Sequence, residues 1–358
     1  MPTLQSADEQ NVKQDDIKRI LILRPDGIGD VINTTPAISA IRQAYQNAHI
    51  DIVARSPGSE ILKLNPYIDD ILTYDPKGLH KSLKSKAGFI KHLRLSLYDM
   101  AIAFRDSSEC NLIAYLSGAR YRIGRKSSGR MFSFTLTDGV DHCDPKGTKH
   151  EIDRNMEIAA IAGGEKGEYD LILRLSEDER NFATDFIKSN DLASESPGRF
   201  ALVGIHPGGS SYDKLWNAES FAAIANRLIR KFDSKIILFN GLGEEHLGDS
   251  IKSMMIYPPV LARQLRLRHV ASLIERCSLF ICNDSGPMHI AAALKIPTIA
   301  IFGPTDHIRW KPYNKSAIIV KKDMDCWPCS AHKCKKSFEC IKTLPVDNVW
   351  NAIEELHT

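Results

Sequence analysis

Short apolar runs alternate with helical patterns along most of the chain, and this alternation limits the fold more than any other feature of the sequence. The runs expected to form strands include Arg19–Arg24, His49–Ala54, Lys235–Asn240, Leu279–Asn283 and Thr298–Phe302. Apolar runs of this length between turns are typical of buried strands. Their alternation with helices favours parallel sheets that carry helices on both faces, so we expect an α/β protein.

The alternation occurs in two blocks, which indicates two domains. It weakens between Gly118 and Gly147 and restarts at Phe200–His206, and a length of 358 residues is ample for two domains. We therefore expect two Rossmann-like, doubly wound domains that face a central cleft. The turn at Ser194–Gly198 is an alternative boundary, but Tyr169–Leu175 can open the second domain. The expected divisions are a polar tail at 1–16, a first domain at 17–168, a second domain at 169–344, and a C-terminal helix at 345–358 that could pack back on the first domain.

The composition is that of a globular protein, with 43% hydrophobic and 25% charged residues. The chain has no apolar stretch near the roughly 18 residues that indicate a membrane span, and Met1–Asp16 lacks the features of a secretory signal. We therefore expect a cytoplasmic protein whose eight cysteines stay reduced. A net charge of +3 is too small for a general nucleic-acid binder, so no nucleic-acid partner is expected.

The first glycine-rich turn, Pro25–Asp30, follows the first expected strand and leads into a helical pattern at Val31–Tyr45. Its two glycines have the spacing that opens a dinucleotide-binding fingerprint, but Ile32 stands where the third glycine would be. Taken alone, these residues are explained most simply as a tight turn in which Asp30 is a helix N-cap.

A second turn, His206–Ser211, also joins an expected strand to a helix. Its two glycines let backbone amides approach a ligand, its two hydroxyls can bind phosphate, and a lysine follows, a combination suited to a diphosphate. An ordinary turn with Trp216 packed in the core explains the same residues equally well. The candidate binding residues are Gly208, Gly209, Ser210, Ser211 and Lys214.

A third turn, Asn283–His289, again lies between an expected strand and a helix. An Asp or Ser can cap this helix while free amides and the positive end of the helix dipole face an anion. The alternative is an ordinary capped helix in which His289 is a half-buried residue with satisfied hydrogen bonds. The candidate binding residues are Asp284, Ser285, Gly286 and His289.

Taken in order, these segments resemble glycosyltransferase family 9, the heptosyltransferases that build the inner core of lipopolysaccharide. The match runs from about Ile17 to the C-terminus. It implies a GT-B fold whose N-terminal domain binds the acceptor and whose C-terminal domain binds the nucleotide sugar. It also implies an inverting transfer that uses neither a metal nor another cofactor. The motifs that carry the resemblance are Gly29-Asp30-Val31 with Thr35-Pro36-Ala37, His206-Pro207-Gly208 with Lys214 and Trp216, Asn283 to His289, and Phe302-Gly303-Pro304-Thr305-Asp306.

The resemblance implies roles for individual residues. Asp30 matches the family's catalytic aspartate, which is proposed to take the proton of the acceptor hydroxyl. The implied donor is ADP-heptose, whose diphosphate would meet the residues of the second and third turns. Glu244 is expected on the ribose hydroxyls, with the adjacent Glu245 as the alternative. The sequence leaves open which acceptor is used and whether the donor is another nucleotide sugar.

Two other classes of function agree less well with the residues. A nucleotide-sugar-binding protein without turnover has little need for a base at Asp30. A Rossmann-type NAD-dependent enzyme that acts on sugar nucleotides, such as an epimerase, is disfavoured by Ile32 in place of glycine. The candidate helices also lack a Tyr-x-x-x-Lys pair.

The acceptor side is expected to be basic. The segment Lys77–Arg94 contains six lysines and arginines and no acidic residue. A solvated helix face is the simpler interpretation of such a run. The resemblance, however, implies an anionic glycolipid acceptor and therefore transient contact with the inner-membrane surface. Arginines that could bind carboxylates or phosphates of the acceptor are Arg105, Arg120, Arg122, Arg125 and Arg130.

Four cysteines near the C-terminus form a further cluster, which also contains His332. Four thiolates could hold a structural zinc ion, although their spacing differs from that of a standard finger or ribbon. We expect reduced thiols that hold a loop, and no metal in catalysis. The cysteines are Cys326, Cys329, Cys334 and Cys340.

Overall fold

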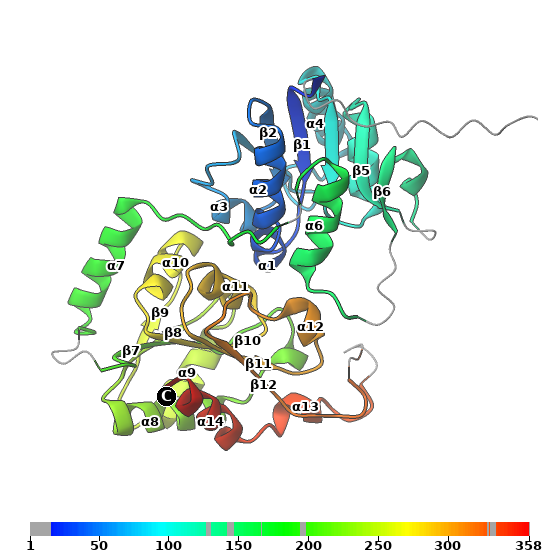
Figure 1. Cartoon of the computed structure of the whole chain (residues 1–358). Coiled ribbons are helices and arrows are strands. Elements are labelled where there is room, and N and C mark those ends of the chain that lie inside the picture. Colours follow the sequence, from blue (N-terminus) through cyan, green and yellow to red (C-terminus); the bar gives the residue numbers. More distant parts are fainter. Residues whose placement is uncertain are drawn as a thin grey trace, which may run out of the picture.

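Two six-stranded sheets, one in each half of the chain, form the framework of the computed structural model (Figure 1). The strand orders are β3-β2-β1-β4-β5-β6 and β12-β11-β10-β7-β8-β9, and all neighbouring strands run parallel. Counted within each half, both sheets have the 3-2-1-4-5-6 order of a doubly wound Rossmann fold. The predicted fold class is therefore confirmed. The structure describes residues 16–126, 130–141, 147–165, 167–193, 198–327, 329 and 334–357.

The first half carries the sheet that begins with the first expected strand. Its strands are β1 (Arg19–Leu23), β2 (His49–Ala54), β3 (Asp70–Thr73), β4 (Met100–Ala103), β5 (Tyr121–Lys126) and β6 (Asp138–Asp141). Its helices are α1 (Ile28–Ile32), α2 (Thr35–Ala44), α3 (Gly58–Ile61), α4 (Leu83–Leu95), α5 (Ser108–Leu116) and α6 (Glu151–Ile161).

The second half repeats this arrangement. Its strands are β7 (Leu202–His206), β8 (Lys235–Phe239), β9 (Val260–Ala262), β10 (Leu279–Asn283), β11 (Thr298–Phe302) and β12 (Ala317–Lys321). Its helices are α7 (Glu177–Ser189), α8 (Ala218–Phe232), α9 (Glu245–Met254), α10 (Leu267–Glu275), α11 (Gly286–Ala293), α12 (His307–Trp310), α13 (Glu339–Lys342) and α14 (Val346–His357).

The helical pattern predicted at Val31–Tyr45 is divided into two helices. The α1 helix ends at its C-cap Asn33, and α2 begins after Thr34 with Pro36 in its first turn. Proline has no N–H group and clashes with the preceding turn of a helix, so it is tolerated at a helix start and not in a helix interior. The break leaves α1 as a short element directly after the carboxyl end of β1.

The two halves meet where α1 contacts α11, near the centre of Figure 1. The contact is close, because a Cβ at Gly29 would collide with the ring of His289. A Cβ at Gly286 would lie only 3.0 Å from Cδ1 of Ile28. Since α1 follows β1 and α11 follows β10, the carboxyl ends of the two sheets face each other across this contact. Ligands of open α/β sheets bind at such ends.

The segment Tyr169–Leu175 does not open the second sheet as a strand. Leu171 and Leu175 are buried in a core cluster with residues of both halves, and the amide of Ile172 donates to Oγ1 of Thr35 in α2. The chain therefore crosses between the halves after α6, which packs on α2, and before α7, which packs on α10. The domain division at residue 168 stays a prediction.

The C-terminal helix α14 packs on the second half, against α8, β11 and β12. Val349 and Ile353 lie in the second core cluster, and Glu354 forms an ion pair with Lys231 of α8. The expectation that this helix packs back on the first domain is wrong, because its apolar face is buried against the sheet that precedes it in the chain.

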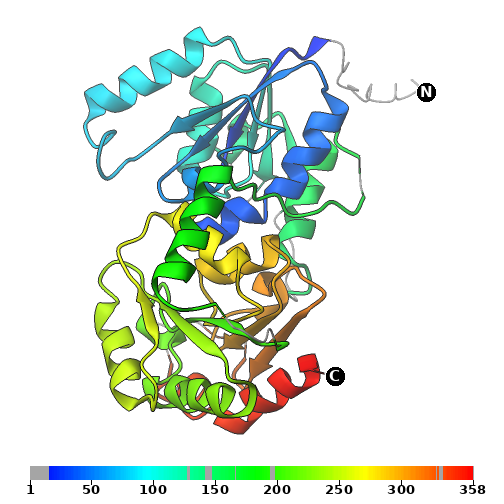
Figure 2. The same ribbon diagram turned by 90° about the vertical axis from the view of Figure 1, so that its left-hand side faces the viewer.

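The helix α4 projects from the first half and is the light-blue helix at the upper left of Figure 2. Within the described residues, no helix combines the length and the apolar character needed to cross a membrane.

Candidate active site

Asp30 lies in the short helix α1, at the carboxyl end of the first sheet. Its side chain is 32% exposed, and its Oδ1 lies 3.1 Å from Nη2 of Arg24. The N-cap of α1 is Gly27, which makes no side-chain cap, so the interpretation of Asp30 as a helix N-cap is wrong. The carboxylate is held by an arginine while one part of it remains accessible.

Arg24 is the centre of a buried charge network. Its side chain is 3% exposed and pairs with Asp30, with Oδ2 of Asp26 at 3.4 Å, and with Oε1 of Glu151 at 3.0 Å. The second oxygen of Glu151 accepts a hydrogen bond from Nε of Arg309 at 2.8 Å. Because Arg309 lies in α12 of the second half, this network joins the two halves beside the candidate base.

Burial shifts the pKa of Asp30 above its ordinary value, and the charge of Arg24 opposes part of that rise. Asp26 and Glu151 raise the pKa of Asp30 further, and Arg309 lowers it. Burial alone would raise the pKa of Glu151 too, but Arg24 and Arg309 hold that pKa below its usual range. Glu151 therefore stays ionised, whereas Asp30 is a stronger base than an exposed aspartate.

The second and third turns lie side by side in the second half and are tied together by Asn283. Its Oδ1 accepts from the amide of Trp216 at 3.2 Å, and its Nδ2 donates to the carbonyl of Pro207 at 2.7 Å. Nζ of Lys214 lies 2.6 Å from Oδ2 of Asp284, a carboxylate whose side chain is 8% exposed. The structure therefore brings the predicted lysine and aspartate together as an ion pair.

Two polar atoms at the N-terminus of α11 have no hydrogen-bond partner in the described part of the chain. They are Oγ of Ser285 and Nδ1 of His289, and both are buried. Burial lowers the pKa of His289 to about 4, so its ring is neutral at neutral pH. Buried polar groups are normally hydrogen-bonded, so these two atoms at one helix N-terminus could bind a ligand. The alternative of a satisfied, ordinary histidine does not agree with this geometry.

Glu244 joins the loops that follow β7 and β8. Its Oε1 accepts from the amide of Gly209 at 3.0 Å, and its Oε2 accepts from the amide of Gly241 at 2.9 Å. A Cβ at Gly208 would collide with this carboxylate. The amide of Gly209 is thus bonded to Glu244, whereas Ser210 and Ser211 are exposed beside it. The role of Glu244 on a ribose stays a prediction.

The predicted acceptor arginines lie in two separate places. Nε of Arg105 is 3.1 Å from Oδ1 of Asp26, and Nε of Arg130 is 3.3 Å from Oδ1 of Asp106, so both lie near the carboxyl end of β4. Arg120 and Arg122 lie instead at the amino end of β5, away from Asp30.

Arg120, Arg122 and Arg125 make contacts within the first half of the chain that stabilise its fold. Arg122 donates to the backbone carbonyls of Thr135 and Ala119, and Arg120 stacks on Tyr121. Arg125 is buried and donates to the carbonyl of Arg154, and burial lowers its pKa to about 10. The structure does not bring these three arginines to the accessible side of Asp30.

The four clustered cysteines do not form a compact ligand set. Cys326 is exposed and the other three are half-buried, whereas His332 lies outside the described residues. Among the described residues, the one group of three or more whose potential metal-ligand atoms all lie within 4.8 Å of one another is His49, Asp51 and Asp70. Asp51 in that group is already paired with Arg19 and bonded to Tyr98. The zinc alternative at the cysteines stays a prediction.

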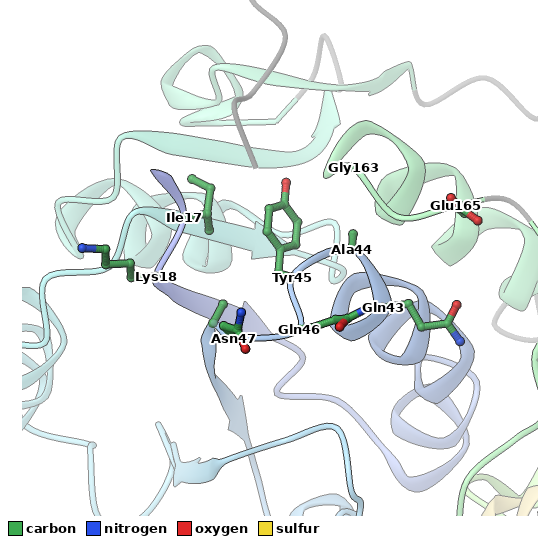
Figure 3. A pocket seen from close by; sticks show the side chains of 10 residues that line it. Ile17, Lys18, Gln43, Ala44, Tyr45, Gln46, Asn47, Gly163 and Glu165 are labelled. Carbon is green, nitrogen blue, oxygen red and sulfur yellow. The ribbon is translucent and has the colours of Figure 1, made fainter. Parts of the chain in front are cut away.

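A hollow of about 1000 Å³ lies away from this site, before the start of β1 and at the end of α2 (Figure 3). Lys18, Gln43 and Glu165 are among the residues that line it. It lies at the amino end of the first sheet, whereas Asp30 lies at the carboxyl end, so it is not part of the candidate active site.

Sequence reasoning missed three residues of the site: Arg24, Glu151 and Arg309. Arg24 directly precedes the first turn, so its position beside the motif was a usable signal. Glu151 is 127 residues from Arg24 and 158 from Arg309, and only the tertiary fold brings them together.

Two Rossmann-like sheets whose carboxyl ends face each other are the architecture of a GT-B protein. The chain belongs to glycosyltransferase family 9, the heptosyltransferases, whose family model matches residues 87–339. The resemblance recognised in the sequence is therefore confirmed, and the protein is an enzyme of that family.

Individual relatives extend the similarity over nearly the whole chain. The chain is 27% identical to lipopolysaccharide heptosyltransferase 3 of Escherichia coli K12, over 92% of this chain and 95% of that protein. A solved family 9 glycosyltransferase from Veillonella parvula is 25% identical, with a TM-score of 0.84 over 95% of this chain and 97% of the other. The ADP-heptose lipopolysaccharide heptosyltransferase II of E. coli has the same fold, with 20% identity and a TM-score of 0.74 over 94% and 98% of the two chains.

Proposed function

We propose that the protein transfers a heptose from ADP-heptose to a hydroxyl of the lipopolysaccharide inner core or a related glycolipid, with inversion at the anomeric carbon. The observation that carries this proposal is the position of Asp30. It is an accessible carboxylate in the helix that contacts the N-terminus of α11, where one polar atom each of Ser285 and His289 has no partner among the described residues. A base in the first half and a donor site in the second thus meet at the contact between the halves.

Asp30 acts as the general base in this mechanism. An alcohol is a weak nucleophile until its proton is removed as the new bond forms. Burial raises the pKa of Asp30, which brings its basicity closer to the working pH and favours proton transfer. Arg24 holds the carboxylate from one side, so its other oxygen can face the acceptor hydroxyl.

The second half stabilises the ADP that leaves. Negative charge grows on the diphosphate as the glycosidic bond breaks, and fixed positive groups stabilise that charge. Lys214 supplies a cation, and the N-terminus of α11 supplies the positive end of a helix dipole. We infer that these groups, with the neutral ring of His289, replace the metal ion that other glycosyltransferases use, and that Glu244 holds the ribose.

The identity of the nucleotide can be tested directly by ligand-induced stabilisation. A ligand that binds only the folded state raises the free energy of unfolding by about 2.7 kcal/mol at 100 times its Kd. We expect ADP-heptose to raise the melting temperature more than GDP- or UDP-sugars at the same concentration. Equal or greater stabilisation by a GDP- or UDP-sugar would contradict the assignment of the donor.

The segment Lys77–Arg94 and helix α4 are proposed to rest on the anionic surface that presents the acceptor. Five cations of this segment are exposed, and leucines with exposed fractions of 70–86% lie among and beside them. Cations attract anionic lipids, and exposed apolar side chains can enter the boundary between head groups and acyl chains. This favours transient contact with the cytoplasmic face of the inner membrane. The leucines are Leu79, Leu83, Leu95 and Leu97.

Neutralising Lys81, Lys84, Lys86 and Lys91 with glutamine is expected to weaken binding to vesicles that contain anionic lipid. Each basic residue near such a surface contributes about 1 kcal/mol, so the loss should be at least tenfold in affinity. The attraction should also fall as salt rises, because surface charges are screened beyond about 8–10 Å at physiological ionic strength. The measurement is vesicle co-sedimentation at several salt concentrations.

A matched control removes the same net charge from the second half. Lys188, Lys252, Lys295 and Lys315 are exposed there, and their replacement by glutamine should leave vesicle binding nearly unchanged. If both sets of substitutions weaken binding equally, the attraction comes from net charge alone. In that case the segment Lys77–Arg94 is a solvated helix face.

A further inference from the structure

Glu151 connects the two halves of the chain at a buried position. Its side chain is 3% exposed, and it lies at the start of α6. Oε1 accepts from Nη2 of Arg24 in the first half at 3.0 Å, and Oε2 accepts from Nε of Arg309 in the second half at 2.8 Å. Each oxygen of one carboxylate thus binds an arginine from a different half.

The arginine on the first-half side is also the one that holds Asp30. Nη2 of Arg24 donates to both Oε1 of Glu151 and Oδ1 of Asp30, and Nη1 donates to the carbonyl of Phe104 at 2.9 Å. One guanidinium nitrogen is therefore shared by two carboxylates. Any change in how strongly Glu151 binds Arg24 changes how Arg24 holds Asp30.

We propose that Glu151 and Arg309 are positioning residues for Asp30, which make the placement of this carboxylate depend on the contact between the two halves. The proposal rests on the proposed role of Asp30 as the base. When the halves are in contact, Arg309 shares the charge of Glu151, and Arg24 remains available to Asp30. When they separate, Glu151 loses Arg309 and keeps its first-half partners, Arg24 and Arg154, whose Nε lies 3.5 Å from Oε2. It then attracts Arg24 more strongly and draws it away from Asp30. The base thus takes its working position only when the donor half is in place.

The charged groups that face Asp30 determine how its pKa should respond when Glu151 or Arg309 is replaced. Arg24 and Asp26 face it from the first half, Glu151 from α6 and Arg309 from α12. The ring of His289 in α11 packs against the neighbouring Gly29.

After burial, which raises the pKa of Asp30, the arginines lower that pKa and the two acids raise it. Arg125 also acts on Glu151 and helps to keep it ionised. Removing the charge of Glu151 should therefore lower the pKa of Asp30, and removing that of Arg309 should raise it.

The experiment compares the pH dependence of kcat for the wild-type enzyme, Glu151→Gln, Arg309→Ala and Arg309→Lys. Activity is lost at low pH when Asp30 becomes protonated. We expect the acid limb to move to lower pH in Glu151→Gln, to higher pH in Arg309→Ala, and to stay in place in Arg309→Lys. Both charge-removing variants should lose about tenfold or more in kcat, a part of the roughly 10²–10⁴-fold that a general base contributes. In Glu151→Gln the loss follows because Asp30 becomes a weaker base, and in Arg309→Ala because Arg24 is drawn away from Asp30.

A second measurement does not depend on activity. The ¹³C shift of the Asp30 carboxyl, assigned with Asp30→Asn, reports its titration in the unliganded protein. The titration midpoint of Asp30 should move to lower pH in Glu151→Gln and to higher pH in Arg309→Ala. If no assay detects sugar transfer but the Asp30 titration midpoint moves as expected, the proposed function is wrong. The influence of Glu151 and Arg309 on Asp30 would still be supported.

The control variant is Arg268→Lys, which changes a hydrogen bond between the halves at Glu60 of α3 and leaves the bond between Arg309 and Glu151 in place. Nη1 of Arg268 donates to the carbonyl of Glu60 at 3.1 Å, and Nη2 donates to that of Arg174 at 2.6 Å, but it is not among the groups that act on Asp30. Its acid limb should coincide with that of the wild type. The proposal is overturned if Glu151→Gln and Arg309→Ala leave the Asp30 titration unchanged or move it in the same direction. A shift in Arg268→Lys as large as theirs would also overturn it.

Discussion

Replacing Asp30 with asparagine is expected to lower kcat about 10²–10⁴-fold, which is the usual contribution of a general base. Asparagine has nearly the same shape and can still accept a hydrogen bond from Arg24, so the fold should be preserved. The affinity for ADP should change little, because the donor groups lie in the second half of the chain. The measurements are steady-state kinetics and calorimetric titration with ADP.

A matched control is Asp26→Asn, which removes a neighbouring carboxylate that also pairs with Arg24 but is not proposed as the base. This variant should retain far more activity than Asp30→Asn. If Asp30→Asn keeps activity within a few fold of the wild type, Asp30 has no part in proton transfer. Equal losses in the two variants would indicate that the charge network, and not a base, had been damaged.

Replacing Lys214 with alanine is expected to weaken ADP binding about ten- to a hundredfold. Hydrogen bonds to charged groups contribute about 1.5–3 kcal/mol, and 1.4 kcal/mol is a factor of ten in affinity. The structure adds a second reason, because Lys214 is the ion-pair partner of the buried Asp284. Without the lysine, an unpaired carboxylate would repel the diphosphate.

The double variant Lys214→Ala with Asp284→Asn separates these two effects. It removes the cation and the unpaired anion together, so ADP binding should recover in part relative to Lys214→Ala alone. Calorimetry with ADP and, separately, with the acceptor provides the measurement. Acceptor affinity should be unaffected in both variants. Loss of acceptor binding with intact ADP binding would mean that the roles of the two halves are reversed.

The central strands were predictable from the sequence because they are buried on both faces. Strands β2, β10 and β11 have the bounds predicted for them. A strand buried on both faces of a parallel sheet is a continuous apolar run, which is easily recognised. The strand β6, with the sequence Asp-Gly-Val-Asp at the sheet edge, has no such run and was missed with its neighbour β5.

The candidate site could be predicted only where its residues lie in local motifs. Asp30, Lys214 and Asp284 each follow a strand in a recognisable turn, and the fold brings these turns to facing sheet ends. Glu151 has no such signal, because its partners come from distant parts of the chain. The acceptor arginines were proposed from residue type alone. Arg122 shows the weakness of that reasoning, because its guanidinium is bonded to backbone carbonyls.

The most direct test of the account is an assay of sugar transfer with purified protein. ADP-heptose and lipopolysaccharide that lacks the inner-core heptoses would be incubated with the enzyme in excess EDTA, and the glycolipid would be analysed by mass spectrometry. We predict that the glycolipid gains the mass of one heptose, that one ADP is released for each heptose added, and that Asp30→Asn forms no detectable product. Contradictory results would be the absence of transfer to any truncated core, a requirement for added magnesium or manganese, or release of ADP without an acceptor.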